Sequence, residues 1–181
     1  MVRQQTLFLT VGLPGTGKTT EARRIEAEQS ALRLTKDDWV KALYGPENPA
    51  GASAVIEGRL IEIALRGLQL GVNVVLDFGL WSRNERTALR QAAAEVGAAV
   101  EIRYFVLTVA EQRERLDRRQ AEAPNTTWAM PDDELAEWAG IIEPPTAGEL
   151  DGSEPLDEPP GGYSTWQEWR NGRWPTSTSP H

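Results

Sequence analysis

The sequence predicts an α/β protein, a three-layer α/β/α sandwich built on a parallel sheet. Short apolar runs alternate with longer segments of helical periodicity, glycines follow the first run at once, and helix-start signals follow the later runs. Strands that alternate with helices of this length form parallel sheets with helices on both faces. Such sheets bind their ligands at the carboxyl ends of the strands.

The first strand and helix are predicted on either side of a glycine loop. The run 7–11 is short and apolar and is followed directly by glycines, so we expect a buried strand there. Helix formers fill 18–29, where Ala22 and Ile25 share one face. A weaker strand is expected at 31–35.

Loop and helix signals then lead to the strongest strand of the chain. The stretch 43–52 holds two glycines and two prolines and predicts a loop, which we interpret as a mobile flap. Apolar residues at helical spacing predict a helix at 53–70, with Gly71 at its C-cap. The unbroken apolar run within 72–77 predicts a buried strand.

Two capping boxes mark the helices that follow. Ser82 and Glu85 have the required spacing and open a helix that ends at a glycine. A further strand is predicted at 100–107, and Thr108 with Glu111 forms a second capping box directly after it. The alternation of strand and helix is therefore repeated four times.

The C-terminal section differs in composition from the rest. Prolines and acidic residues dominate from Glu143 onward, and no basic residue appears until Arg170, which predicts an acidic, extended connection. Three tryptophans lie in the tail and are expected to dock on the domain or on a second subunit, namely Trp166, Trp169 and Trp174. We therefore expect one domain over 1–142 and an acidic, Pro-rich connection with a Trp-containing tail over 143–181.

Composition and charge narrow the classes of partner. The net charge of −8 disfavours nucleic acid, because phosphate neutralisation needs clustered Lys and Arg, and so favours a small molecule. The chain has no cysteine and a single histidine, His181, so a thiolate metal site is excluded, and either the catalytic base is a carboxylate or none is needed. Neither a signal-peptide pattern nor an apolar run of roughly 18 residues is present, so we expect a cytoplasmic protein without membrane contact.

The glycine loop carries a complete phosphate-binding motif. The run Gly12-Leu13-Pro14-Gly15-Thr16-Gly17-Lys18-Thr19 matches G-x-x-x-x-G-K-[ST] and lies between a predicted strand and a predicted helix. Backbone N–H groups can converge there on phosphates, with Lys18 at the β- and γ-phosphates and Thr19 on Mg²⁺. The alternative is a glycine-rich turn without a ligand. We expect ATP or GTP to be bound by Gly12, Pro14, Gly15, Thr16, Gly17, Lys18, Thr19 and Thr20.

With this motif, the sequence resembles the P-loop kinase superfamily, near the branch of adenylate kinase, zeta toxins and chloramphenicol phosphotransferase. The loop at 12–19 and the run Val-Val-Leu-Asp-Phe-Gly-Leu-Trp at 74–81 carry the resemblance. A narrower similarity, over residues 5–150, is to a bacterial group of small-molecule kinases. It is carried by Asp77-Phe78-Gly79, Trp81-Ser82-Arg83, Arg115, Arg119 and Glu143-Pro144-Pro145. The resemblance implies transfer of a γ-phosphate to a hydroxyl group.

Carboxylates at strand ends are the candidates for metal ligand and base. Asp77 ends the strand expected beside the P-loop strand, where a carboxylate can hold Mg²⁺; a turn cap is the alternative. Asp37 and Asp38 end the second strand, a position that in the chloramphenicol phosphotransferase resemblance carries the proposed base. We predict that Asp37 is the base, with Asp38, or an N-cap role for either, left open.

Four arginines lie on one predicted helix just before a loop at 124–127. By resemblance this is the lid, near 113–130. Arg115 and Arg119 have i, i+4 spacing and are predicted to stabilise the charge that phosphoryl transfer gathers. A solvated basic face is the alternative.

Residues just after the strand ends are candidates for contacts with the acceptor. Trp39, Trp81 and Arg83 could form an aromatic and cationic wall above the phosphates, although aromatic residues are also common in cores, and Asp38 is a further candidate for contact with the acceptor. No fifth strand is predicted after the helix at 131–142. The loop that usually recognises the base therefore cannot be located, and ATP and GTP both remain open.

Three functions are compatible with these residues. The first is a phosphotransferase acting on a hydroxyl of a nucleoside, sugar or antibiotic, with antibiotic resistance as one purpose. The second is a polynucleotide 5′-kinase or a nucleotide-sugar kinase, and the third is an NTP-binding regulatory protein whose tail engages a partner. Asp37, Asp77 and the lid arginines together favour catalysis, by a monomer or a homodimer.

Overall fold

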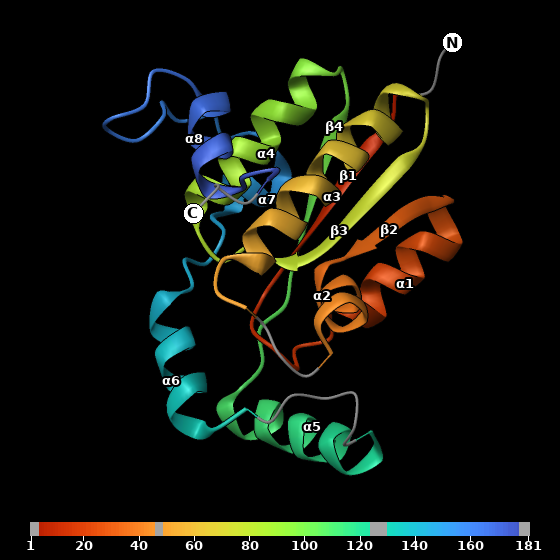
Figure 1. Cartoon of the computed structure of the whole chain (residues 1–181), viewed down its shortest axis with the longest axis vertical. Helices are drawn as coiled ribbons and strands as arrows, with labels where there is room; N and C mark the ends of the chain where they lie inside the picture. The colour runs from red at the N-terminus through yellow and green to blue at the C-terminus, as the bar shows by residue number, and fades with distance from the viewer. Residues whose placement is uncertain (1–3, 46–48, 124–129, 178–181) are drawn as a thin grey trace.

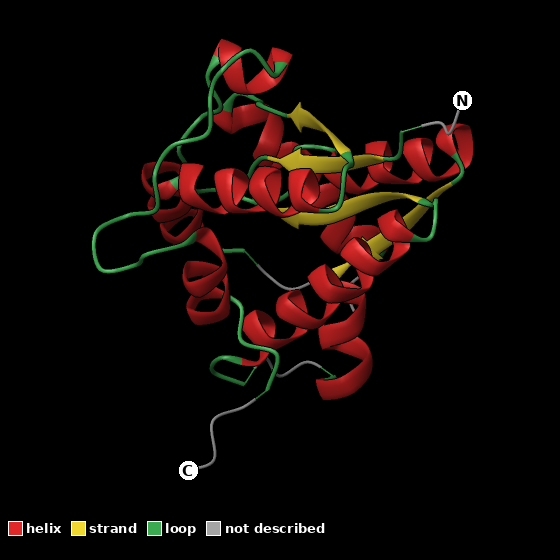
Figure 2. Ribbon diagram, turned by 90° about the horizontal axis from the view of Figure 1, so that it is seen from above, coloured by secondary structure: helices red, strands yellow, loops and turns green. Residues whose placement is uncertain are grey.

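A computed structural model describes residues 4–45, 49–123 and 130–177. They form a four-stranded parallel sheet with helices on both faces (Figures 1 and 2), as the sequence predicts. The strands are β1 (Thr6–Val11), β2 (Ala31–Thr35), β3 (Asn73–Gly79) and β4 (Ala99–Tyr104). Their order is β2-β3-β1-β4, so the P-loop strand β1 lies at the centre beside β3.

The helices that the structure describes follow the predicted alternation with strands and continue into the C-terminal section. They are α1 (Lys18–Gln29), α2 (Lys36–Tyr44), α3 (Ala52–Gln69), α4 (Arg83–Glu95), α5 (Val109–Glu122), α6 (Asp132–Ile141), α7 (Ala147–Asp151) and α8 (Trp166–Arg173). Both predicted capping boxes are present, at the starts of α4 and α5. Among the described residues, no helix is both long enough and apolar enough to cross a membrane.

Alternation along the strands creates a core on each face of the sheet. Phe8 and Val75 are register partners and pack on one face with Ala22 and Ile25 of α1. The other face carries the larger core, which α3 and α4 cover, with α8 packed outside α4 (Figure 1). The three-layer prediction is thereby confirmed.

Two predicted strand ends are wrong. Asp37 and Asp38 do not end β2; they lie in the first turn of α2, whose N-cap is Thr35. The acidic residues complement the positive end of the helix dipole, and the alternative of an N-cap role for either of them does not apply because Thr35 is the N-cap. Strand β4 ends at Tyr104 rather than at 107.

The loop predicted at 43–52 is shorter than expected. Helix α2 runs to Tyr44 and α3 already begins at Ala52. The centre of the proposed flap, 46–48, lies outside the described residues, as does 124–129 of the proposed lid.

The C-terminal section packs on the sheet-bearing part of the chain. Its acidic portion was expected to be extended, but it contains α7, whose capping box pairs Thr146 with Glu149. Trp166 and Trp174 are buried within the main core, which confirms docking of the tail on the domain. The rings of the three tail tryptophans meet edge to face, with centroids 5.6 and 5.7 Å apart for successive pairs.

Candidate active site

The P-loop connects the end of β1 to the start of α1. Gly12 has a φ of 149°, and a Cβ there would lie 2.6 Å from the Phe105 carbonyl oxygen, so only glycine lets the two backbones approach. The Gly12 N–H donates to the Gly79 carbonyl at 3.2 Å. Gly17, in the left-handed region, forms the N-cap of α1. The loop is thus held against the ends of β3 and β4. The N-terminus of α1 faces the space beyond the carboxyl ends of the strands.

Lys18 is half-buried in the loop. Its Nζ donates a hydrogen bond to the Leu13 carbonyl at 2.7 Å. Burial lowers the pKa of the Lys18 ammonium to about 8, although Asp77 and Asp37 act in the opposite direction. The ammonium is therefore short of counter-charge, which is the state expected of a group that binds an anion.

Nucleotide affinity is expected to fall at alkaline pH. Because the pKa of Lys18 is about 8, the free protein loses this charge above that pH, whereas bound phosphates would favour the protonated form. The dissociation constant of ADP should rise about tenfold for each pH unit above 8, with uptake of a proton on binding. Calorimetry of ADP binding between about pH 7 and 9.5 measures both. An affinity that stays constant over this range would contradict the assignment of Lys18 to the phosphates.

Asp77 lies within β3 beside the P-loop. It is buried and accepts hydrogen bonds from the hydroxyls of Thr10 at 3.4 Å and Thr35 at 3.5 Å. Burial raises the pKa of its carboxyl, and a hydrogen bond with Thr19 and the charge of Lys18 oppose this rise. Asp77 is therefore a strand residue in contact with the P-loop threonine, as a metal-binding role requires, and not a cap of the following turn.

Asp37 approaches the same place from α2. Its charge raises the pKa values of both Lys18 and Asp77, and it pairs with Lys36 at 3.4 Å. Asp38 instead pairs with Arg33 at 3.5 Å. Trp39 is 47% exposed. Of the three residues at this helix start, Asp37 is the one that electrostatics couple to the P-loop.

Helix α5 places arginines over the P-loop. Gln112 Nε2 donates to the Pro14 carbonyl at 2.8 Å, and the Arg115 guanidinium lies 3.5 Å from the point where a Cβ of Gly17 would stand. The charge of Arg119 lowers the pKa of Lys18. Figure 1 shows α5 beyond the carboxyl ends of the strands. The structure thus brings both predicted lid arginines to the P-loop.

The predicted acceptor contacts Trp81 and Arg83 have protein partners. Trp81 Nε1 donates to the Gly12 carbonyl at 3.1 Å. Arg83 forms ion pairs at 2.6 Å with both Glu154 and Asp157. Docking of the acidic C-terminal section brings Glu154 and Asp157 to the start of α4, where they pair with Arg83. A contact between Arg83 and the acceptor stays a prediction.

A cavity of about 280 Å³ opens beside the P-loop at the end of β3. Its lining comes from five helices and the strand end, and consists of Lys36, Glu57, Phe78, Leu80, Trp81, Ser82, Glu85, Ile141 and Arg173. Sequence reasoning proposed only Trp81 among these as a site residue. Lys36 had a signal, since it directly precedes Asp37; Glu57 and Arg173 had none, because helical periodicity does not report which distant segments meet.

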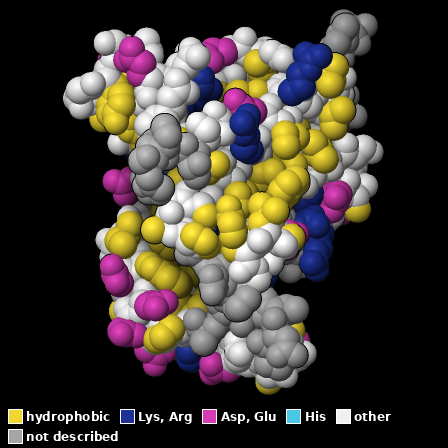
Figure 3. All heavy atoms as spheres, viewed as in Figure 1, with side chains coloured by type: hydrophobic (Ala, Val, Ile, Leu, Met, Phe, Trp, Pro, Cys, Tyr) yellow, Lys and Arg dark blue, Asp and Glu magenta, His cyan; other side chains and the backbone are white. Residues whose placement is uncertain are grey.

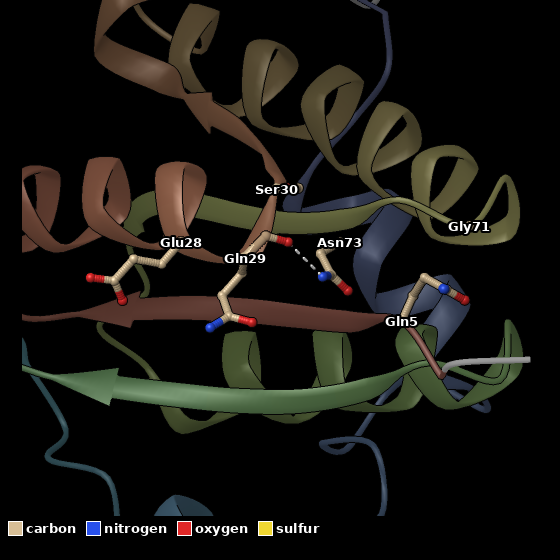
Figure 4. Close-up of a pocket in the computed structure, with 6 residues that line it drawn as sticks. All are labelled: Gln5, Glu28, Gln29, Ser30, Gly71 and Asn73. Atoms are coloured by element: carbon tan, nitrogen blue, oxygen red, sulfur yellow. Dashed lines mark hydrogen bonds between the residues drawn. The ribbon is translucent and has the colours of Figure 1, made fainter.

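A second cavity, of about 230 Å³, lies at the opposite end of the sheet (Figure 4). There Asn73 Nδ2 donates to the Gln29 carbonyl at 2.9 Å and its Oδ1 accepts from the Thr6 N–H at 3.0 Å. Asn73 thus ties three segments together at the amino ends of the strands. Ligands of parallel sheets bind at the other end, so we assign this cavity a structural origin.

Solved structures share this fold. A candidate kinase from Chloroflexus aurantiacus is 17% identical with a TM-score of 0.65, covering 94% of this chain and 97% of that one. A gluconokinase from Sinorhizobium meliloti 1021 is 16% identical with a TM-score of 0.53, covering 81% and 78%. A chain of the Pnkp1/Rnl/Hen1 RNA repair complex is 20% identical with a TM-score of 0.62, covering 86% of this chain.

These similarities establish the fold. This chain spans 48% of the length of the RNA-repair chain, and 39% of the length of the chain that it matches in a second structure of that complex. No curated protein matches the sequence. The family model described as "AAA domain" matches residues 7–145, a stretch that includes the P-loop, Asp37, Asp77, Arg115 and Arg119. The chain therefore belongs to the AAA domain family and has the fold of the P-loop kinases.

Proposed function

We propose that the protein transfers the γ-phosphate of ATP or GTP to a hydroxyl group of a small molecule. The observation that carries the proposal is the position of Asp37 in the first turn of α2, two residues after Thr35, which is the register partner of Asp77; from there its charge acts on both Lys18 and Asp77. Nucleotide binding alone needs the lysine and a metal-binding group. A second carboxylate next to them, in the first turn of α2, is the group that an acceptor hydroxyl needs.

The oxygen ligands at the P-loop fit Mg²⁺. Thr19 and Asp77 provide a hydroxyl and a carboxylate that contact each other, and Mg²⁺ takes few protein ligands because nucleotide phosphates and water supply the rest. Within 4–45, 49–123 and 130–177, no group of three or more acidic, His or Cys side chains is placed so that it could hold a metal ion. When bound, Mg²⁺ offsets charge on the β- and γ-phosphate oxygens.

The chain's own residues can then perform the transfer. The acceptor oxygen attacks the γ-phosphorus, the bond from that phosphorus to the β–γ bridging oxygen breaks, and the nucleoside diphosphate leaves. Asp37 takes the hydroxyl proton, while Lys18, Arg115 and Arg119 stabilise charge on the transferring group. ATP and GTP are cytoplasmic metabolites, and we infer a cytoplasmic location on that ground.

A polynucleotide acceptor is the second candidate, since one structural neighbour belongs to an RNA repair complex. The net charge of −8 opposes it. On the face seen in Figure 3, basic side chains are scattered among acidic and apolar ones and form no continuous track. The acceptor could instead be a nucleotide sugar or an antibiotic, or the protein could have a regulatory role without transfer. Measuring nucleoside diphosphate release with each acceptor distinguishes these possibilities.

Replacing Asp37 by Asn is expected to lower the transfer rate about 10²- to 10⁴-fold, because the hydroxyl proton loses its acceptor. Nucleotide affinity should change little. The measurement is nucleoside diphosphate release with ATP or GTP and Mg²⁺, against nucleosides, sugars, a nucleotide sugar, chloramphenicol, aminoglycosides and a 5′-hydroxyl oligonucleotide.

The matched control is Asp133→Asn, which exchanges an exposed carboxylate in the first turn of α6 and should leave the rate unchanged. Full activity of the Asp37 variant would remove this residue from the mechanism. Tight nucleotide binding that no acceptor converts into turnover would favour the regulatory role instead.

A further inference from the structure

The cavity at the end of β3 is connected to the phosphate site at two points. Trp81 lines the cavity and donates to the Gly12 carbonyl of the P-loop at 3.1 Å. Lys36 also lines it and pairs with Asp37 at 3.4 Å. A molecule held in this cavity would therefore lie next to both the nucleotide and the proposed base.

The C-terminal segment supplies one wall of the cavity. Arg173, the last residue of α8, lines it together with Glu57 of α3. Trp174 Nε1 donates to Glu57 Oε2 at 2.9 Å. A Cβ at Gly58 would stand 2.6 Å from the Trp174 carbonyl oxygen, so α3 has a glycine where the backbone of the segment must approach. The segment and α3 are thus shaped to meet at this cavity.

The charges in the cavity balance. Arg173 pairs with Glu85 at 2.5 Å and with Glu57 at 3.6 Å, and Lys36 pairs with Glu57 at 3.7 Å. Two cations and two carboxylates therefore share one small space. Such a network can donate hydrogen bonds to hydroxyl oxygens and accept them from hydroxyl protons, but it gives no net attraction to a phosphate or to a polyanion.

Apolar groups complete the lining, from Phe78, Leu80, Trp81 and Ile141. Polar groups on one side and aromatic or aliphatic groups on the other suit a ring with hydroxyls at its edge and an apolar face. The volume of about 280 Å³ is at the lower end of the range for ligand pockets, roughly 300–1,000 Å³. It fits a single small ring system better than a large antibiotic.

We propose that this cavity binds the acceptor, that the acceptor is a neutral polyhydroxylated ring compound, and that Arg173 of the C-terminal segment and Glu57 bind its hydroxyls. The inference rests on the proposed phosphotransferase function and narrows its substrate class. It also gives the C-terminal segment a role in specificity, since Arg173 reaches the cavity only when the segment is docked.

The test uses the full chain, the P-loop variant Lys18→Met and three further variants. Arg173→Gln removes the cavity guanidinium. Arg170→Gln is the matched control, since Arg170 lies on the same helix and pairs with Glu95 of the same partner helix α4, at 3.1 Å, but does not line the cavity. Ile141→Trp narrows the cavity from α6 without touching its ion pairs, and near-ultraviolet circular dichroism of the tryptophans verifies docking in each variant.

The probes are glucose, myo-inositol, adenosine and uridine, with glucose 6-phosphate and a 5′-hydroxyl oligonucleotide as anionic rivals. Turnover is measured with ATP or GTP and Mg²⁺, and binding by calorimetry with a non-hydrolysable ATP analogue present. For a neutral probe that binds, Arg173→Gln and Ile141→Trp should each raise its KM or Kd at least about tenfold. The KM for the nucleotide should not change, and Arg170→Gln should match the unmodified chain.

The outcomes separate this inference from the function it rests on. Phosphorylation of only an anionic rival, with loss in Lys18→Met, would overturn the cavity assignment and leave the kinase function standing. A neutral probe that binds in an Arg173-dependent way without being phosphorylated would keep the site and remove the function. Failure of every neutral probe to bind, or equal affinity in Arg173→Gln, would overturn the inference.

Discussion

Replacing Lys18 by Met is expected to lower kcat/KM for phosphoryl transfer at least about 10³-fold while the chain stays folded. The Lys18 ammonium is buried in the loop, donates to the Leu13 carbonyl at 2.7 Å, and has its pKa lowered to about 8 by burial. Its charge is thus poorly solvated before nucleotide binds, so phosphate oxygens gain a strong electrostatic partner. Methionine keeps most of the stem volume and removes only the charge.

Lys41→Met is the matched control, because Lys41 lies in the last turn of α2, outside the P-loop. Nucleoside diphosphate release and thermal unfolding are measured for both variants. A Lys18 variant that keeps more than about a tenth of the activity would mean that the loop does not stabilise the transferring group.

The features predicted correctly from the sequence are local ones. The P-loop is a contiguous motif, and the capping boxes at Ser82 and Thr108 involve residues three apart. The position of Asp77 beside the P-loop also follows from the apolar run of β3, since parallel strands end at the same edge of the sheet. Short-range patterns of this kind depend little on the rest of the fold.

What could not be predicted depends on distant segments or on weak signals. The cavity joins Lys36, Glu57 and Arg173, which are far apart in the sequence and meet only through packing. Helix α7 had a local signal, the spacing of Thr146 and Glu149, but the surrounding prolines and acidic residues favoured an extended chain. A helix forms there despite this composition because Glu149, besides its role in the capping box, pairs with a buried side chain.

That side chain is Arg86, and breaking the pair is expected to lower the free energy of unfolding by about 3–5 kcal/mol. Arg86 Nε donates to Glu149 Oε1 at 2.8 Å, and both side chains are almost completely buried. In Glu149→Ala the Arg86 guanidinium has lost its counter-charge and is still buried, where water cannot reach it. Urea unfolding measures the loss. Asp151→Ala, an exposed residue of the same helix, is the control and should change stability by less than about 0.5 kcal/mol.

The double variant Arg86→Met, Glu149→Met separates loss of the pair from loss of packing. Replacing both charges with apolar groups removes the uncompensated charge, so this variant should recover much of the stability lost in Glu149→Ala. If the single variant lost less than about 1 kcal/mol, the arginine would have to be hydrated or satisfied elsewhere, and the docked arrangement of α7 would be contradicted.

The pair also connects the C-terminal section to the P-loop. Arg86 Nη1 donates to the carbonyls of Leu80 and Trp81, at 3.3 and 3.2 Å. Leu80 is buried with a φ of +41°, a strained conformation for a side-chain-bearing residue that persists only where neighbouring contacts impose it. The same turn holds Trp81 against Gly12. Glu149 thus fixes Arg86, Arg86 fixes the turn, and the turn shapes both the loop that faces the nucleotide and the cavity beside it, so the acidic section belongs to the architecture of the site.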